Sequence, residues 1–222
     1  MRFLFHDDAG AARVSLKGEE LKYIVKVRRH REGDTLALRH RDRSTTLYTY
    51  RLATVGGREA ELLLLSEAPM RVGAARPLHI GWCVIDPKAV EKVLPLLNEM
   101  GVAKITFVDC DRSQRQFKQD FSRLKRILEA SMQQCGRSDW MVLTSATLPD
   151  FVAANPQTVV LDFCDEVLEE GAGIETVLVG CEGGFSEEER RLLAGCRSVR
   201  FDTQLILRSE SAAVAAAAKI LL

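Results

Sequence analysis

The 222-residue chain lacks the cysteine motifs that mark common metal and redox sites. Its six cysteines are widely spaced and form no CxxC pair, so neither a zinc site nor a dithiol redox motif is indicated. Several of them lie in apolar runs, where a free cysteine behaves as a small hydrophobic residue. We therefore expect no metal site and a reducing, cytoplasmic location.

Long apolar runs and an excess of charge of one sign are missing as well. No run approaches the roughly 20 residues that span a bilayer, and the start, MRFLFHDD, turns acidic too early for a secretory signal peptide. Lys plus Arg and Asp plus Glu each number 31, so the formal net charge is zero. A nucleic-acid-binding protein of this balance must concentrate its positive charge locally. The hydrophobic fraction of 46% is enough for a core in one or two domains.

One segment near the N-terminus does concentrate positive charge. Residues 22–43 hold three acidic residues against eight basic ones: Lys22, Lys26, Arg28, Arg29, Arg31, Arg39, Arg41 and Arg43. This pattern fits a solvated charged face or a surface that binds nucleic-acid phosphates, and it does not decide between them. The segments TLALRHRD, STTLYTYRLATV and EAELLLLSEA alternate or run apolar between turn signals, which predicts a small β-barrel over the first 70 residues.

The predicted secondary structure changes after MRVGAARP, residues 70–77, which is the best candidate for a linker. Strands are predicted at LHIGWCV, KITFV, MVLT, TVVLDF and VLVG. A helix is predicted from Pro87 to Gly101, with a kink or break at Pro95, and apolar residues from Phe117 onward recur at helical spacing. Alternating strands and helices favour an α/β fold with a parallel sheet.

A glycine-rich stretch, VLVGCEGGFSEEERRLL, joins a predicted strand to a predicted helix at residues 177–193. Ser186 and Glu189 have the capping-box spacing that begins a helix. The turn has neither the GxGxxG spacing of a dinucleotide site nor the Gly-Lys-Ser/Thr of a phosphate loop. Its glycines would let a ligand approach the main chain, and Glu182 would suit a ligand with positive charge or hydroxyl groups. A tight turn without a ligand is the alternative.

Several motifs together resemble one family. They are VGCEGGFSEEE (179–189), LILRSESA (205–212), NEMGVAKI (98–105), DRS (111–113), QQCGRS (133–138) and VRRHREGD (27–34). Their order and spacing are similar to those of the RsmE family, SPOUT-superfamily methyltransferases that methylate N3 of a uridine in 16S ribosomal RNA. The resemblance covers nearly the whole chain.

The resemblance implies two domains. Residues 1–72 would form a PUA-like RNA-binding β-barrel. Residues 73–222 would form a SPOUT methyltransferase domain, with a parallel sheet and a deep trefoil knot that binds S-adenosyl-L-methionine (SAM). The implied partners are 16S rRNA or the small ribosomal subunit, and a second copy of the chain packed through the knot; no membrane is expected.

The resemblance also implies site residues. The candidate catalytic residues are Arg208 and Glu210, although Glu210 could simply be a helix-start acid that complements the helix dipole. The candidate cofactor-binding residues are Leu161, Gly180, Glu182, Gly183, Gly184, Leu205, Leu207 and Ser211. The candidate RNA-binding residues are Arg28, Arg29, Arg31, Arg112 and Arg137, and a surface ion pair is the alternative for the last two.

The sequence departs from the family pattern at the cofactor loops. Cys181 stands where GPEGG has proline, and Thr203 and Leu205 stand where Leu-Gly-x-Arg-Ile-Leu-Arg has glycine and arginine. Two other functions therefore stay open. One is ribose 2′-O methylation of RNA by a similar knotted enzyme; the other is a non-catalytic role in RNA binding or ribosome assembly.

Overall fold

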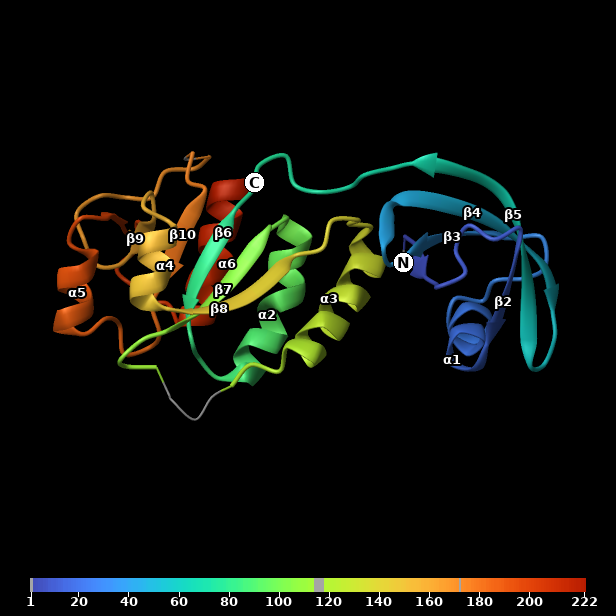
Figure 1. Ribbon diagram of the computed structural model, residues 1–222, viewed down its shortest axis with the longest axis horizontal. Coiled ribbons are helices and arrows are strands. Elements are labelled where there is room, and N and C mark those ends of the chain that lie inside the picture. Colours follow the sequence, from blue (N-terminus) through green and yellow to red (C-terminus); the bar gives the residue numbers. More distant parts are fainter. Residues whose placement is uncertain (1, 114–117, 172) are drawn as a thin grey trace. The chain divides into compact units, whose positions relative to one another are not determined.

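The computed structural model describes residues 2–113, 118–171 and 173–222, and its elements are drawn in Figure 1. Phe117, at the start of a predicted helical stripe, lies outside the described residues. The chain divides into two compact units. One contains Met1–Gly73 and Met132–Asp139, and the other contains Ala74–Ser131 and Trp140–Leu222.

The first unit is built on a five-stranded sheet of order β1-β3-β4-β5-β2. Strand β1 pairs with β3 in parallel, and the other neighbours are antiparallel. The alternating apolar residues predicted from the sequence form its buried face, with Leu16, Leu38, Tyr50, Leu52 and Leu62 all fully buried. The strands are β1 (Leu4–Phe5), β2 (Arg13–Lys17), β3 (Thr35–His40), β4 (Arg43–Val55) and β5 (Glu59–Pro69).

The basic segment of this unit begins in helical structure. Helix α1 (Gly18–Leu21) runs directly into a π-helix, η1 (Lys22–Val27), before the loop that leads to β3. Arg39 does not belong to a charged surface, because it is 1% exposed and its guanidinium donates to the carbonyl oxygens of Ser44 (2.5 Å) and Met70 (2.9 Å). Arg41 pairs with Asp7. The predicted run of charge is therefore divided between the surface and the interior.

The second unit is an α/β fold with a six-stranded parallel sheet of order β11-β9-β10-β6-β7-β8, as the alternation of strands and helices predicted. Five of its strands occupy the predicted segments, and β11 was not predicted. Their bounds are β6 (His79–Cys83), β7 (Lys104–Asp109), β8 (Val142–Thr147), β9 (Val159–Leu161), β10 (Thr176–Val179) and β11 (Arg197–Val199).

The helices start and stop where the sequence places its caps. Asp86 accepts a hydrogen bond from the Lys88 amide at the start of α2, and Gly101 ends that helix in a left-handed conformation (φ 98°). The helix continues through Pro95, so of the predicted kink or break the break does not occur, and the kink stays a prediction. The helices are α2 (Pro87–Met100), α3 (Phe121–Cys135), α4 (Leu148–Ala154), α5 (Glu187–Leu193) and α6 (Ser209–Leu221). None of the helices in the described ranges is both long and apolar enough to cross a bilayer.

Alternate residues of β6 face different helices. Gly81 faces α4, because a Cβ at this position would lie 2.3 Å from the Phe151 ring. Trp82 points to the opposite face, where its indole meets Ser209 at the start of α6. Helices α2 and α6 pack against each other, and α6 also contacts β10. The start of α6 is thereby fixed beside the carboxyl ends of β6 and β10, the edge at which open parallel sheets bind ligands.

A polar network crosses the sheet on the face covered by α4. The His79 imidazole lies 2.7 Å from the Thr106 hydroxyl, which lies 2.9 Å from the hydroxyl of Thr144. Phe151 packs edge-on against the imidazole ring. Burial lowers the pKa of His79 from 6.5 to about 4, and the charge of Lys104 acts in the same direction.

This pKa makes stability depend on pH with a definite sign. Between pH 6.5 and about 4 the unfolded chain binds a proton at His79 that the folded chain does not. Stability is therefore lost as the pH falls through that window. Between pH 7.5 and 5 the free energy of unfolding of His79→Gln should fall by on the order of 1 kcal/mol less than that of the wild-type protein. This value is reduced for the partial exposure of His79. Urea unfolding of both proteins at several pH values measures it, and parallel stability–pH curves would contradict the assignment.

Candidate functional site

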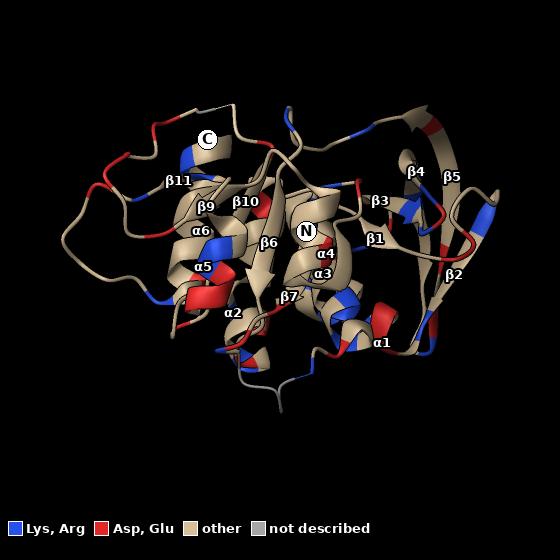
Figure 2. Cartoon of the chain, turned by 60° about the vertical axis from the view of Figure 1, so that its left-hand side comes forward, with Lys and Arg blue, Asp and Glu red and all other residues tan. Residues whose placement is uncertain are grey.

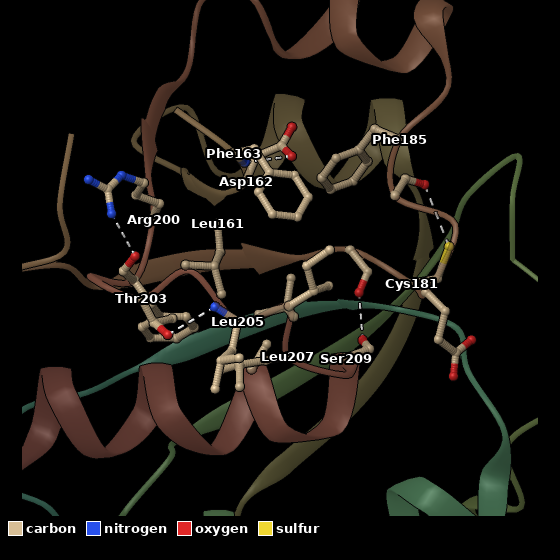
Figure 3. A pocket seen from close by; sticks show the side chains of 17 residues that line it. Leu161, Asp162, Phe163, Cys181, Phe185, Arg200, Thr203, Leu205, Leu207 and Ser209 are labelled. Atoms are coloured by element: carbon tan, nitrogen blue, oxygen red, sulfur yellow. Dashed lines mark hydrogen bonds between the residues drawn. The ribbon is translucent and has the colours of Figure 1, made fainter. Parts of the chain in front are cut away.

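A cavity opens where β9, β10 and β11 end (Figure 3). Its lining comes from three stretches that are distant in sequence: residues 161–163, 179–185 and 200–212. The first follows β9, the second is the glycine-rich turn after β10, and the third runs from the end of β11 into α6. The glycine-rich turn and the 205–212 motif thus meet the end of the predicted strand 158–163 at one place.

The glycine-rich turn is held rigidly at both of its ends. The Gly184 amide donates to the Cys181 carbonyl at 2.9 Å, and Gly184 adopts φ 65°. The predicted capping box is confirmed: the Glu189 amide donates to the Ser186 hydroxyl at 3.2 Å, and the Ser186 amide donates to the Glu189 carboxylate at 2.7 Å. Figure 2 shows that α5, which this box starts, contains both acidic and basic residues.

A buried serine joins the turn to helix α6. The Ser209 hydroxyl donates to the Gly180 carbonyl at 2.5 Å and accepts a hydrogen bond from the Trp82 indole at 2.9 Å. Trp82 is fully buried, so its indole N–H depends on the Ser209 hydroxyl for a hydrogen bond. Ser209 itself is 4% exposed and is part of the cavity lining. This link fixes the distance between the turn and the first residue of α6.

Most of the predicted cofactor residues line this cavity. The ones that do are Leu161, Gly180, Glu182, Gly184, Leu205 and Leu207. Gly183 and Ser211 are not part of the lining. The Gly183 carbonyl accepts a hydrogen bond from Arg112 instead (2.7 Å), and Ser211 is exposed on α6.

The cavity wall is largely apolar and much of it is uncovered. The side chains of Phe163, Leu205 and Leu207 are 78%, 76% and 37% exposed. Such exposed apolar surface at a cavity is typical of a site that takes a partly apolar ligand. Phe163 was not predicted, because a single exposed phenylalanine after a strand has no periodic pattern around it.

Charged groups enter the cavity at separate points. Asp162 lines it and pairs with Arg190 of α5, while its carboxylate also accepts the Phe163 amide at 2.8 Å. Arg200 lines it from the end of β11. Neither Asp162 nor Arg200 stood out in the sequence, since their positions relative to the glycine turn depend on strand order. In the described part of the chain no three His, Cys, Asp or Glu side chains are grouped so as to hold a metal ion.

Cys181, which replaces the proline of the family pattern, lies in the turn itself. Its thiol is directed at the Gly184 carbonyl, with sulfur and oxygen 3.6 Å apart. Burial raises the pKa of this thiol, so it stays protonated at neutral pH. The substitution therefore leaves a neutral, locally bonded side chain in the cavity wall.

The two predicted catalytic residues lie at the start of α6. Arg208 is the exposed N-cap residue, and no hydrogen bond or ion pair of its guanidinium is found among the described residues. Glu210 stands in the first turn, and its Oε2 atom is buried without a hydrogen-bond partner in the part of the chain that the structure describes. A carboxylate oxygen so placed keeps its capacity to accept a proton. Neither side chain lines the cavity.

The predicted RNA-binding arginines have different surroundings. Arg28 lies over the Tyr23 ring at 5.4 Å, and Arg29 holds a left-handed backbone conformation (φ 60°) that is uncommon for a residue with a side chain. The Arg31 amide donates to Asp34 at 2.8 Å, and its side chain is exposed. These three share one loop, which we call the η1–β3 loop (residues 28–34).

Arg137 differs from the other candidates. It is 6% exposed, and burial lowers its pKa from the ordinary value. In this conformation the Arg137 guanidinium does not face the surface, and its RNA-binding role stays a prediction. Arg112 is exposed, but it is already engaged, because it packs on Gly183 and donates to its carbonyl.

Comparison with protein families places the second unit in a known group. The model of a family described as "RNA methyltransferase domain" matches residues 73–221. Two curated relatives, each called ribosomal RNA small subunit methyltransferase E and coming from two strains of Helicobacter pylori, are 36% identical to this chain over 219 residues. The match covers 96% of this chain and 96% of each relative.

Solved structures share the fold over nearly the full length. A ribosomal RNA small subunit methyltransferase E from Neisseria gonorrhoeae, bound to S-adenosyl methionine, superposes with a TM-score of 0.77 at 20% identity, over 98% of this chain and 95% of that one. A predicted RNA methyltransferase from Thermotoga maritima gives a TM-score of 0.72 at 23% identity, over 100% and 97% of the two chains. Both likenesses are of fold.

The buried serine link can be tested by stability. We expect Ser209→Ala to lower the free energy of unfolding by about 1–3 kcal/mol, because it leaves the Trp82 indole N–H buried without an acceptor. Ser209→Thr should retain most of the stability, since it keeps the hydroxyl. Ser211→Ala, at an exposed position of the same helix, is the matched control and should change stability by less than about 0.5 kcal/mol. Equal losses for Ser209→Ala and Ser211→Ala in urea titrations would refute the link.

Proposed function

Since the chain belongs to the RsmE family of RNA methyltransferases, we propose that it uses SAM to methylate N3 of a uridine in the 16S ribosomal RNA of the small subunit. The observation that carries the proposal is the cavity at the ends of β9, β10 and β11, whose walls include parts of the glycine-rich turn and of the 205–212 motif. A ligand in this cavity would touch the glycine turn, the apolar residues of 205–207 and the start of α6.

The cavity residues suit a SAM molecule. The exposed apolar side chains of Phe163, Leu205 and Leu207 offer a surface for the adenine ring, and the glycine turn brings main-chain groups close to the ligand. Glu182 and Arg200 supply charges of both signs for a ligand that carries both. When bound, SAM supplies an electrophilic methyl group on a positively charged sulfur.

A deep trefoil knot is part of the same proposal. Support comes from how residues 166–171 lie against the end of the chain. The Arg200 amide donates to the Glu166 carbonyl (2.8 Å), and the Gly171 amide donates to the Lys219 carbonyl (3.0 Å). At the start of α6, the Ser209 hydroxyl donates to the carbonyl of Gly180 in the glycine-rich turn. The segment from β11 to α6 thus has hydrogen bonds to two separate loops, which are contacts that a threaded chain would make.

Arg208 and Glu210 carry the chemistry in this proposal. Uridine N3 holds a proton at neutral pH and becomes a good nucleophile only when that proton leaves. The Arg208 guanidinium stays charged and donates to a carbonyl oxygen beside N3, which stabilises the anion as it develops. Glu210 or Glu182, the second of which lines the cavity, accepts the N3 proton. The target uridine has to leave its stack for N3 to be reached.

The remaining parts serve RNA binding and assembly. Residues 1–72 then act as a PUA-like barrel whose η1–β3 loop holds RNA phosphates through Arg28, Arg29 and Arg31, a contact that positions the RNA without reading its sequence. Arg112 can contact RNA with the donors that Gly183 does not use. The active form is a homodimer joined through the knot domain, and it works on the small ribosomal subunit in the cytoplasm.

Nucleoside analysis tests the reaction directly. The purified protein, SAM carrying a labelled methyl group and small subunits from cells that lack the gene should yield labelled 3-methyluridine after digestion of the RNA. A label on ribose would identify a 2′-O methyltransferase instead. SAM binding in calorimetry without any labelled nucleoside would point to a non-catalytic RNA-binding protein.

The role of Arg208 has a specific consequence. We expect Arg208→Ala to lose methyl transfer while the Kd for SAM stays within about tenfold of the wild-type value, about 1.4 kcal/mol. The reason is that its guanidinium acts on the base and does not line the cavity. Arg191→Ala, at an exposed position on α5, is the control and should turn over normally. Wild-type turnover by Arg208→Ala would remove this residue from the mechanism.

The η1–β3 loop can be tested by the salt dependence of RNA binding. Replacing Arg28, Arg29 and Arg31 by Gln should weaken RNA binding and reduce the slope of log K against log salt by up to about 2, near 0.7 for each phosphate that is no longer neutralised. The control is Arg13→Gln, an exposed arginine of β2 that pairs with Glu61. An unchanged slope in the triple variant would show that the loop does not contact phosphates. SAM binding, measured separately, should be unaffected.

A further inference from the structure

One guanidinium at the cavity wall belongs to none of the motifs described above. Arg200 follows β11 directly, and its side chain lines the cavity and is 35% exposed. Its main chain is held on both sides, because its amide donates to Glu166 and its carbonyl accepts from Leu168, each at 2.8 Å. Figure 3 shows Arg200 on the side of the cavity away from Cys181. A fixed backbone with a partly exposed side chain is the arrangement of a binding residue more than of a flexible surface residue.

The charged groups near Arg200 use few of its hydrogen-bond donors and balance little of its positive charge. Its Nη1 atom donates to the Phe201 carbonyl at 3.0 Å, and its ion pair with Asp202 spans 3.6 Å to a carboxylate that is 81% exposed. Asp162, the partly buried carboxylate of the cavity, is neutralised by Arg190. Arg200 thus keeps most of its five donors and a positive charge that no buried anion balances among the described residues.

Arg200 also offsets a departure in the sequence. Position 205, where the family pattern has an arginine, is Leu205 in this chain, and that leucine lines the same cavity. The cavity nevertheless contains a guanidinium, that of Arg200, which enters from a position five residues earlier. A planar guanidinium matches the two oxygens of a carboxylate better than any other side chain does.

We propose that Arg200 determines cofactor specificity by binding the carboxylate of the methionine portion of SAM. The inference depends on the proposed function, since it requires SAM in this cavity. Arg200 takes no part in methyl transfer. Its effect is to favour a ligand with an intact amino-acid end over one that lacks the carboxylate.

The test compares two ligands that differ in the carboxylate alone. Calorimetry would measure the Kd of SAM and of decarboxylated SAM, which keeps the adenosine, the sulfonium and the amine. We expect the wild-type protein to prefer SAM by about 10- to 100-fold, the range for charge-assisted hydrogen bonds. In Arg200→Gln that preference should fall below about threefold, with the loss confined to SAM. Arg200→Lys should recover part of the preference, since it keeps the charge without the paired geometry.

Two results would overturn the inference. One is an equal loss of affinity for both ligands in Arg200→Gln, which would mean that Arg200 only supports the loop through Phe201 and Asp202. The other is an unchanged preference in Arg200→Gln. Arg191→Gln, outside the cavity, should leave both affinities unchanged. If the wild-type protein bound neither ligand, the proposed function itself would fail, which separates the two conclusions.

Discussion

The hydroxyl of Ser209 is the contact on which the rest of the cavity depends. It lies between an indole N–H from β6 and a carbonyl from the turn after β10, and it belongs to the first residue of α6. Three elements far apart in sequence are thus joined through the hydroxyl oxygen of a residue that is only 4% exposed. Because a buried donor without an acceptor is costly, the turn cannot move away from α6 without a penalty. The positions of Arg208 and Glu210 follow from this constraint.

Two further sets of hydrogen bonds hold the glycine-rich turn and the start of α5. The carboxylate of Glu189 accepts the amides of both Ser186 and Asp111, so the helix cap also fixes the loop after β7. From that loop Arg112 reaches the Gly183 carbonyl. The residue expected to meet RNA and the turn expected to meet the cofactor are therefore in direct contact.

Local sequence signals predicted much of this fold. The capping box at Ser186, the start at Pro87 and the stop at Gly101 depend on neighbouring residues, and all three are found as predicted. Features that depend on distant partners were missed. Arg39 lies within the predicted charged run, yet its side chain is buried and its guanidinium donates to the carbonyl oxygens of Ser44 and Met70. Arg200 and Asp162 enter the cavity because of strand order, which no short-range pattern specifies. The resemblance to a family, and not periodicity, supplied most of the candidate site.

The protonation state of Cys181 has a consequence for an enzyme that handles a reactive methyl group. A thiolate in the cavity wall would be a strong nucleophile and would compete with the RNA for the donor, ending in an S-methylated, inactive protein. Desolvation raises the pKa of this thiol and keeps it in the weakly reactive SH form. At the position where the family pattern has proline, the turn therefore holds a neutral thiol that is a weak nucleophile toward a methyl donor in the cavity.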